Sequence, residues 1–333
     1  MRVLITGSSG YLGTLVTNYL ISKHISVSGI GLGKYPKVAE NEYFNYYSCD
    51  VADRERLAFI FREQQPTHVI HLASTFNKVR NRKREYSVDI GGSKNIVEIT
   101  NSTSSVKQLI YSSSAVVYGA HNTNPVWIPE SFPLNPGKYR YGLNKSMVEE
   151  MILSTPVRKN LHLLTLRICQ VTGPSSSNRN FLKLLLKSPV LPSLCMDNKI
   201  QLLHESDFLE LLIHILNDDE IEGTYNMAPD NYASISDLAP YKLYLPLPLP
   251  LISALLSIFW HLRILNFESV SVNNGIFPII IDPTCLMNRY DYKFRYSTMD
   301  AFTDTVLNDK WYSEALKQLR REIDSRIFKR SDM

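Results

Sequence analysis

The stretch Arg2–Gly13, RVLITGSSGYLG, decides the fold. It begins with a short apolar run rich in β-branched side chains, which predicts a buried strand. Gly7, Gly10 and Gly13 then follow at every third position, and a helical pattern begins at Tyr11. Glycine allows a tight turn and a close approach of the backbone to a ligand, and a helix N-terminus attracts a pyrophosphate. We therefore expect a dinucleotide at this strand-to-helix turn.

Strand-like and helix-like segments alternate through the first half of the chain. Strands are expected at 2–6, 26–32, 43–48, 68–73, 107–112 and 161–168, and helices at 11–22, 53–64, 85–100 and 141–153. Such alternation predicts right-handed βαβ units and a parallel sheet with helices on both faces. The expected fold class is α/β, a Rossmann-type doubly wound parallel sheet with a smaller C-terminal substrate-binding domain.

The pattern changes near Gly173, where a polar Ser/Asn loop begins and the later segments become shorter and richer in proline. We expect residues 1–172 to form an NAD(P)-binding Rossmann domain. Residues 173–333 are expected to form a substrate-binding region, some of whose elements return to the sheet.

The composition is that of an ordinary globular protein, with 44% hydrophobic and 20% charged residues among 333. This excludes disordered and collagen-like classes. The net charge of +4 is too balanced to indicate nucleic-acid binding. Four widely spaced cysteines fit reduced thiols, no signal peptide is apparent, and no histidine pair has metal-ligand spacing. We expect a cytoplasmic protein without a metal.

The end of the second expected strand leaves the cofactor open between NAD and NADP. An acidic residue that binds the adenosine ribose is usual there, but Ile30–Lys34 contains no carboxylate. Lys34 is the nearest charged residue, and a cation suits the 2′-phosphate of NADP. The alternative is that Lys34 is a solvated loop residue.

A serine cluster and a Y-x-x-x-K pair supply the candidate chemistry. Tyr141 and Lys145 are four residues apart on an expected helix, so they share one face. A neighbouring cation favours phenolate and lowers a tyrosine pKa, which makes Tyr141 a candidate proton shuttle for a carbonyl/alcohol pair. The serines of Tyr111–Ser114 end a parallel strand, where such sheets bind ligands, and can hydrogen-bond the reacting oxygen.

Together these motifs resemble the extended short-chain dehydrogenase/reductase family, and within it the NAD-dependent epimerase/dehydratase group. The resemblance covers about residues 1–235 well and the remainder loosely. The matching segments occur in the family's order: the glycine turn, Asp50-Val51, His71–Ser74, Ser112–Gly119, Tyr141 with Lys145, Leu166–Pro174, His204–Asp207 and Gly223–Asn226.

The resemblance implies roles for single residues. Ser114 would hydrogen-bond the substrate oxygen, Tyr141 would be the acid/base, and Lys145 would tune Tyr141 and bind the nicotinamide ribose. Substrate contacts would include Arg179 and Asn180 as well as Ser114. The implied cofactor-binding residues are Gly7, Ser9, Gly10, Tyr11, Leu12, Gly13, Lys34, Asp50, Val51, Leu72, Ala73, Ser74, Tyr141 and Lys145.

Dehydratases of this group usually have an acidic residue just after the active-site Ser/Thr, whereas Ala115 follows Ser114 here. The segment looks most like that of UDP-galactose-type 4-epimerases. The alternative is an NADPH-dependent reductase of a keto sugar or another small ketone, towards which Lys34 points. A non-catalytic cofactor-binding member is a third hypothesis, because Asp89 stands where the family often has Asn.

An apolar tract rich in Leu and Pro, at 238–265, has two interpretations. The first is a core or lid helix beside the substrate. The second is a peripheral membrane contact through 251–265, since these 15 residues are too few to span a bilayer. The resemblance also implies a homodimer, with a nucleotide sugar or a small ketone as substrate.

Overall fold

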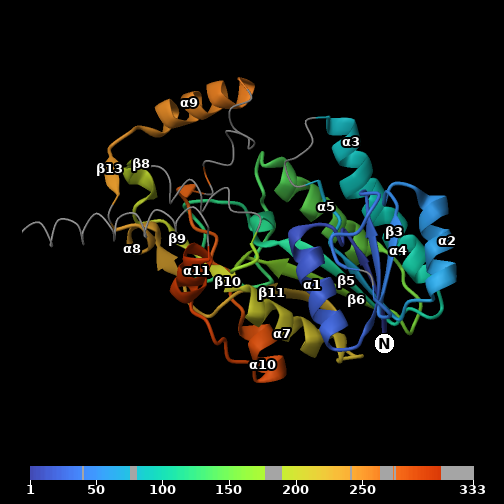
Figure 1. Ribbon diagram of the computed structural model, residues 1–333. Helices are drawn as coiled ribbons and strands as arrows, with labels where there is room; N and C mark the ends of the chain where they lie inside the picture. The colour runs from blue at the N-terminus through green and yellow to red at the C-terminus, as the bar shows by residue number, and fades with distance from the viewer. Residues whose placement is uncertain are drawn as a thin grey trace, which may run out of the picture.

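The computed structural model describes residues 1–39, 41–75, 81–176, 190–240, 242–262, 273 and 275–308. Its centre is a seven-stranded sheet in the order β11-β6-β5-β4-β1-β2-β3 (Figure 1). The strands are β1 (Arg2–Thr6), β2 (Ser26–Gly31), β3 (Phe44–Ser48), β4 (His68–His71), β5 (Gln108–Ser114), β6 (His162–Ile168) and β11 (Gly223–Met227). All neighbouring pairs are parallel. The predicted α/β fold class is confirmed.

The strand order places a ligand crevice beside β1. The chain runs outward from β1 to β3 and then crosses to β4 on the other side of β1. Where the order reverses in this way, the loops at the carboxyl ends of the two central strands separate and leave room for a ligand. The glycine turn follows β1 at this point, and Leu72–Ser74 follows β4.

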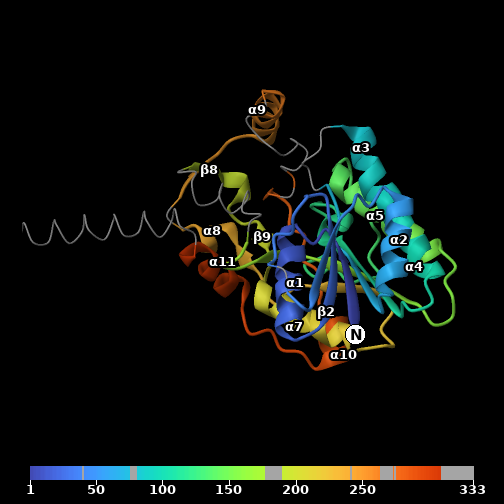
Figure 2. The same ribbon diagram turned by 45° about the vertical axis from the view of Figure 1, so that its right-hand side comes forward.

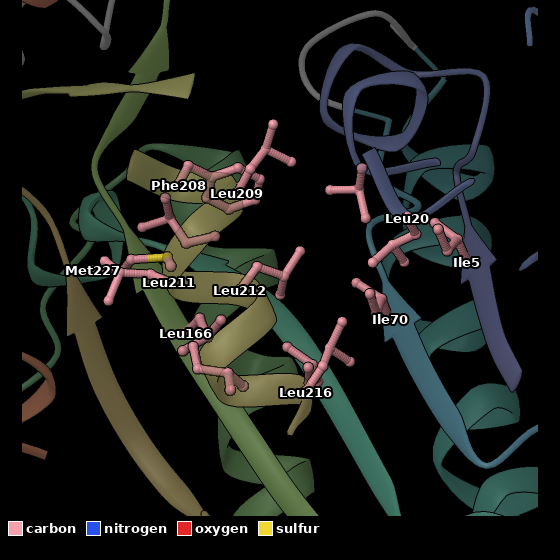
Figure 3. Close-up of a cluster of buried hydrophobic side chains, with 14 of the residues drawn as sticks. Ile5, Leu20, Ile70, Leu166, Phe208, Leu209, Leu211, Leu212, Leu216 and Met227 are labelled. Carbon is pink, nitrogen blue, oxygen red and sulfur yellow. The ribbon is translucent and has the colours of Figure 1, made fainter. Parts of the chain in front are cut away.

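Two hydrophobic cores cover the two faces of the sheet, because successive strand residues point to opposite sides. On one face, Ile5 packs with side chains of α1 (Tyr11–Ser22) and α7 (Glu205–Leu216), and Figure 3 shows part of this cluster. On the other face, Leu4 packs with side chains of three further helices. These helices are α2 (Arg54–Gln64), α4 (Ser93–Ser102) and α5 (Arg140–Ser154).

The helix expected at 85–100 differs from the prediction. It consists of α3 (Arg82–Tyr86), a π-helical turn, η1 (Ser87–Gly92), and then α4. A Cβ on Gly92 would lie 2.4 Å from Val51 Cγ2, so the helix approaches the loop after β3 more closely than a larger residue would allow. π-Turns of this kind are frequent at functional sites, and this one includes Asp89.

The second half adds small sheets and helices beside the main sheet. β10 (Leu202–His204) pairs with β7 (Gln170–Thr172), β12 (Ala233–Ser234) with β9 (Lys199–Ile200), and β13 (Leu243–Leu245) with β8 (Val190–Pro192). Its helices within the described residues also include η3 (Ser193–Cys195), α8 (Ile235–Leu238), α9 (Leu249–His261), α10 (Thr284–Tyr290) and α11 (Thr298–Leu307), while η2 (Ala115–Tyr118) follows β5 in the first half. β11 returns to the main sheet beside β6, as expected for this half. The boundary between 172 and 173 stays a prediction.

Helix α9, within the apolar tract, lies at the periphery and apart from the main sheet in both ribbon views (Figures 1 and 2). Among its described side chains only Ile252 is buried, whereas Leu251 is 45% exposed and Ile258 is 52% exposed. This exposure does not fit a helix of the core. Within the described residues no helix is both long and apolar enough to cross a bilayer. Residues 263–265 lie outside the described part, and the lid and the membrane contact both stay predictions.

Candidate active site

The glycine turn after β1 has no room for larger residues. Gly7 has a φ of +71°, and a Cβ there would lie 2.8 Å from the Ala73 amide nitrogen. A Cβ on Gly13 would lie 2.1 Å from the Gly7 carbonyl oxygen. Gly10 N donates to the same carbonyl over 2.8 Å, which closes the turn at the start of α1. The turn thus has the tight backbone that a pyrophosphate site requires.

The loop after β4 is fixed against this turn. Leu72 N donates to the Thr6 carbonyl over 3.2 Å, and Ala73 N donates to Thr6 Oγ1 over 3.3 Å. The ring of His71 lies between Thr6 Oγ1, at 2.6 Å, and Ser93 Oγ, at 2.9 Å. Burial and the charge of Lys145 lower the pKa of His71 to about 3. The ring is therefore uncharged at neutral pH, and it links β1 to α4 through its two hydrogen bonds.

Ser74 provides an observation that fits a ligand at this edge. Its Oγ is buried and has no hydrogen-bond partner within the described chain. A buried hydroxyl usually finds a partner, because leaving one unpaired costs about 1–3 kcal/mol. The glycine turn and Ser74 together fit a dinucleotide that lies across the ends of β1 and β4.

The end of β2 leaves the choice between NAD and NADP open. Lys34 is exposed, with its Nζ 5.4 Å from the centre of the Tyr35 ring. Tyr46, on β3, donates its phenol proton to the Gly33 carbonyl over 2.7 Å and lies 3.4 Å from Ser9 Oγ. The sequence did not single out Tyr46, because only the register of β2 with β3 brings it beside the glycine turn.

Asp50 and Val51 follow β3, as the resemblance implies. Asp50 Oδ1 accepts from Ala52 N over 2.9 Å, and its other oxygen pairs with the Arg84 guanidinium of α3. Val51 is in contact with Gly92. The contact of Asp50 with a cofactor stays a prediction.

The structure brings Ser114, Tyr141 and Lys145 together at the carboxyl end of β5. The hydroxyls of Tyr141 and Ser114 are hydrogen-bonded. Lys145 Nζ donates to the Ser112 carbonyl over 2.5 Å and lies 5.7 Å from the centre of the Tyr141 ring. These side chains therefore converge from β5 and α5, as the i and i+4 spacing on α5 predicts.

The electrostatics correct one expectation. Burial raises the pKa of Tyr141 well above its ordinary value, with the charges of Tyr139 and Asp89 acting in the same direction, while the Ser114 hydrogen bond lowers it. The pKa of Tyr141 was expected to be lowered and is instead raised in the chain on its own, because burial outweighs the effects that favour the phenolate. Burial lowers the pKa of Lys145 to about 8.

A small pocket lies between the loop after β4 and the side chains of Tyr141 and Lys145. It is lined by Ala73, Ser74, Asp89, Ser93, Tyr111, Tyr141, Asn144 and Lys145. Asp89 and Asn144 were not among the site residues expected from the sequence. Their approach depends on the π-turn, which no sequence pattern indicated.

A buried network of hydrogen bonds joins α5, which carries Tyr141 and Lys145, to β6 and β11. Arg167, on β6, donates to Glu149 Oε2 over 2.7 and 3.0 Å, and to Tyr118 Oη over 2.7 Å. Tyr118 Oη in turn donates to Asn226 Oδ1 over 2.9 Å. Three of the matched segments therefore share one structural role, which is to anchor α5 and β11 to the sheet.

The substrate side of the site is only partly described. Arg179 and Asn180 lie outside the described residues, so their substrate contacts stay predictions. Glu205 accepts a hydrogen bond from the Tyr11 phenol over 2.8 Å and from Ser175 N over 3.1 Å. Glu205 thus links the glycine turn to the loop after Gly173, a contact between distant segments that the sequence did not indicate. No cluster of metal-ligating side chains occurs in the described part of the chain.

The family model described as "NAD dependent epimerase/dehydratase family" matches residues 3–228. The chain belongs to this family. Its matched region contains every element that forms the glycine turn, the β4 loop and the Ser114, Tyr141 and Lys145 group.

Similar proteins agree with this membership. The chain is 30% identical over 164 residues to a UDP-glucose 4-epimerase of Neisseria meningitidis serogroup C, which covers 45% of this chain and 47% of that enzyme. A second UDP-glucose 4-epimerase, from Lactobacillus helveticus, is 28% identical over 53% of each chain. The family member described here thus spans about half the length of these curated relatives.

Solved structures show the same fold over nearly the whole chain. The Bordetella bronchiseptica enzyme WbmG, in complex with NAD and UDP, has a TM-score of 0.74 at 22% identity and covers 94% of this chain and 96% of its own. The UDP-glucose 4-epimerase of Thermotoga maritima, with UDP-glucose, has a TM-score of 0.72 at 20% identity and covers 95% and 99%. At this identity the likeness establishes the fold.

Proposed function

We propose that this family member is an NAD(P)-dependent epimerase that inverts a carbinol carbon of a nucleotide sugar by hydride transfer. The observation that supports this most is the meeting of Ser114, Tyr141 and Lys145 at the end of β5. A phenol and an ammonium there can move a hydroxyl proton, and the adjacent glycine turn fits a dinucleotide.

Each of the three side chains has a separate role in this proposal. Ser114 Oγ holds the substrate oxygen and orients it toward Tyr141. Tyr141 Oη takes the proton from the hydroxyl and returns it after the keto sugar has presented its other face. Lys145, as an ammonium, favours the phenolate of Tyr141 and binds the nicotinamide ribose.

The cofactor would lie across the ends of β1 and β4. When bound, it supplies the hydride acceptor and donor and, in its oxidised form, a positive charge that favours the Tyr141 phenolate. The glycine turn from Gly7 to Gly13 would hold its pyrophosphate, Asp50 its adenine, and Leu72–Ser74 its central part. We propose NAD as the cofactor, because the family is described as NAD dependent and WbmG was solved with NAD.

The proposed substrate is a nucleotide sugar, and a uridine nucleotide is the first choice. The similar curated proteins are UDP-glucose 4-epimerases, and WbmG was solved with UDP. Arg179 and Asn180 are the proposed contacts to the diphosphate, since Arg can form two parallel hydrogen bonds to a phosphate. A homodimer is the proposed assembly.

A reductase is the second candidate. Residues 30–34 have no carboxylate and end at Lys34, and this composition suits the 2′-phosphate of NADPH. Its reaction would use one hydride per substrate and release an oxidised cofactor, whereas an epimerase returns the hydride to the sugar.

One experiment separates the two candidates. The purified protein is incubated with UDP-glucose, UDP-galactose and their N-acetylated forms, first without added cofactor and then with NAD or NADP, and a UDP-4-keto sugar is incubated with NADH or NADPH. The sugars are separated after hydrolysis, and the consumption of reduced cofactor is recorded. We expect interconversion of one pair of sugars without net consumption of cofactor. Stoichiometric consumption of NADPH with a keto sugar would contradict the epimerase and support the reductase.

A further inference from the structure

Asp89 is a buried carboxylate in the pocket that contains Tyr141 and Lys145. Its residue is 6% exposed, and its oxygens accept from Thr75 N over 2.8 Å, Thr75 Oγ1 over 2.9 Å and Asn144 Nδ2 over 3.1 Å. All of these donors are neutral groups, so they orient the charge of Asp89 without cancelling it.

Lys145 is the cation that faces this charge. Nearly all of Lys145 is buried, at 5% exposure, and it shares the pocket lining with Asp89. Titratable groups face Lys145 from every element packed around it: Asp89 from η1, His71 from β4, Tyr111 from β5, and Tyr141 and Glu149 from α5. Of these groups, only Asp89 and Glu149 have carboxylates.

The two carboxylates differ in whether a cation is hydrogen-bonded to them. Glu149 forms a two-bond pair with the Arg167 guanidinium, at 2.7 and 3.0 Å, so its charge already has a buried partner. Asp89 has no such pair within the described chain, where its side chain accepts hydrogen bonds from Thr75 and Asn144. The charge of Asp89 is therefore the one left to balance Lys145.

Asn144 fixes the geometry between the two helices. Its Nδ2 donates to Asp89 Oδ2 and also to Glu85 Oε1, at 3.0 Å, and Glu85 pairs with Arg140 at 3.2 Å. Asn144 directly precedes Lys145, so these bonds hold this part of α5 against the π-turn. Along this row, the cations Arg140 and Lys145 stand at the two ends, and the carboxylates of Glu85 and Asp89 lie between them on either side of Asn144.

We propose that Asp89 is a positioning residue that acts through Lys145, as the counter-charge that keeps the buried ammonium protonated. This inference deepens the proposed function, because it matters to catalysis only if Lys145 assists Tyr141. It assigns a purpose to a carboxylate at a position where an amide would form the same kind of hydrogen bond to Thr75.

Burial is the force that Asp89 opposes. Desolvation lowers the pKa of Lys145 to about 8, and the charge of Asp89 is the largest of the two that raise it. An opposite charge at close range shifts a pKa by roughly 1–3 units. Without Asp89, Lys145 would be substantially neutral near pH 7, and a neutral amine no longer favours the Tyr141 phenolate.

The test measures how much Lys145 contributes to stability at each pH. The free energy of unfolding is measured from about pH 6 to about pH 10 for each chain and for the same chain with Lys145→Met, and the difference between the two free energies is plotted against pH. A lysine with a lowered native pKa makes this difference rise with pH once the folded chain releases its proton. The chains are the wild type, Asp89→Asn, and Glu85→Gln as the matched control, which neutralises the other carboxylate bonded to Asn144.

We expect Asp89→Asn to move the onset of this rise down by about one pH unit or more, and Glu85→Gln to move it by less than half as much. Equal shifts in both variants, or no shift in Asp89→Asn, would overturn the proposal. If Asp89→Asn gives too little folded protein, the smaller Asp89→Ser is judged by the same criterion. The measurement needs no substrate. Its result therefore tests the role of Asp89 even if the protein proves not to be an epimerase.

Discussion

Lys145 Nζ donates to the Ser112 main-chain carbonyl over 2.5 Å. The ammonium is thereby held two residues before Ser114, at the edge of the sheet where β5 ends and α5 begins its second turn. The bond explains why a serine-rich strand end and a Y-x-x-x-K helix belong to one site. The strand backbone, and not only the helix spacing, sets where the lysine lies.

The glycine turn provides a first prediction. Gly13→Ala should reduce cofactor affinity by at least about 100-fold, because a Cβ would lie 2.1 Å from the Gly7 carbonyl oxygen and displace the turn. Gly275→Ala is the matched control, since the φ of Gly275, like that of Gly13, is not positive, and no atom lies within 4 Å of its Cβ position. Binding is measured by fluorescence titration with NAD and with NADP. Equal affinities in the two variants would contradict this account of the turn.

The buried Arg167–Glu149 pair provides a second prediction. Arg167→Met should lower the free energy of unfolding by about 3–5 kcal/mol, because it leaves the Glu149 carboxylate buried without its cation. Urea unfolding measures the loss. The double variant with Glu149→Leu should recover most of it, since no unpaired charge remains. A single variant as stable as the wild type would show that the pair does not anchor α5.

Histidine burial provides a third prediction, on acid stability. Burial lowers the pKa of His68 to about 4, below its ordinary value of 6.5. Between these values the unfolded chain binds a proton that the folded chain does not, so stability falls as the pH drops below about 6.5. At pH 5 this group costs about 2 kcal/mol relative to neutral pH.

His68→Gln should therefore reduce the loss of unfolding free energy between pH 7 and pH 5 by about 2 kcal/mol. The control is His24→Gln, since His24 is exposed and its ring lies edge-on to that of Tyr43 at the surface, 5.2 Å away between ring centres. Urea unfolding at the two pH values measures both variants. An acid loss in His68→Gln as large as in the wild type would rule out this explanation.

Helix α9 provides a fourth prediction. If its apolar surface contacts a membrane, the wild type should float with liposomes that contain anionic lipid, and Leu251→Glu with Ile258→Glu should abolish flotation. Both side chains are largely exposed, so the double variant should unfold at nearly the same temperature as the wild type. A wild type absent from the lipid fraction would contradict the membrane contact. In that case, a raised KM in the same double variant would support a lid over the substrate.

Local sequence signals predicted the parts of the site that depend on neighbouring residues. The glycine spacing predicted the turn because Gly7 and Gly13 meet within a few residues, and the i, i+4 spacing placed Tyr141 and Lys145 on one face of α5. The strand alternation was likewise sufficient for the parallel sheet.

The remaining parts depend on contacts between distant segments. Asp89 enters the pocket through a π-turn whose close approach requires Gly92 to face Val51, a contact across 41 residues. Glu205 meets Tyr11 across 194 residues, and Tyr46 reaches the glycine turn only through strand register. The pKa of Tyr141 was also expected in the wrong direction, because a sequence shows a neighbouring cation but not the degree of burial.

The role of Tyr141 is the central claim, and one measurement tests it most directly. Wild type and Tyr141→Phe are compared for interconversion of the nucleotide-sugar pair that the assay of the proposed function selects, with cofactor binding and unfolding temperature measured on the same samples. We predict that Tyr141→Phe lowers kcat by about 100- to 10,000-fold and leaves cofactor affinity and folding nearly unchanged. A variant that retains full turnover would contradict the account.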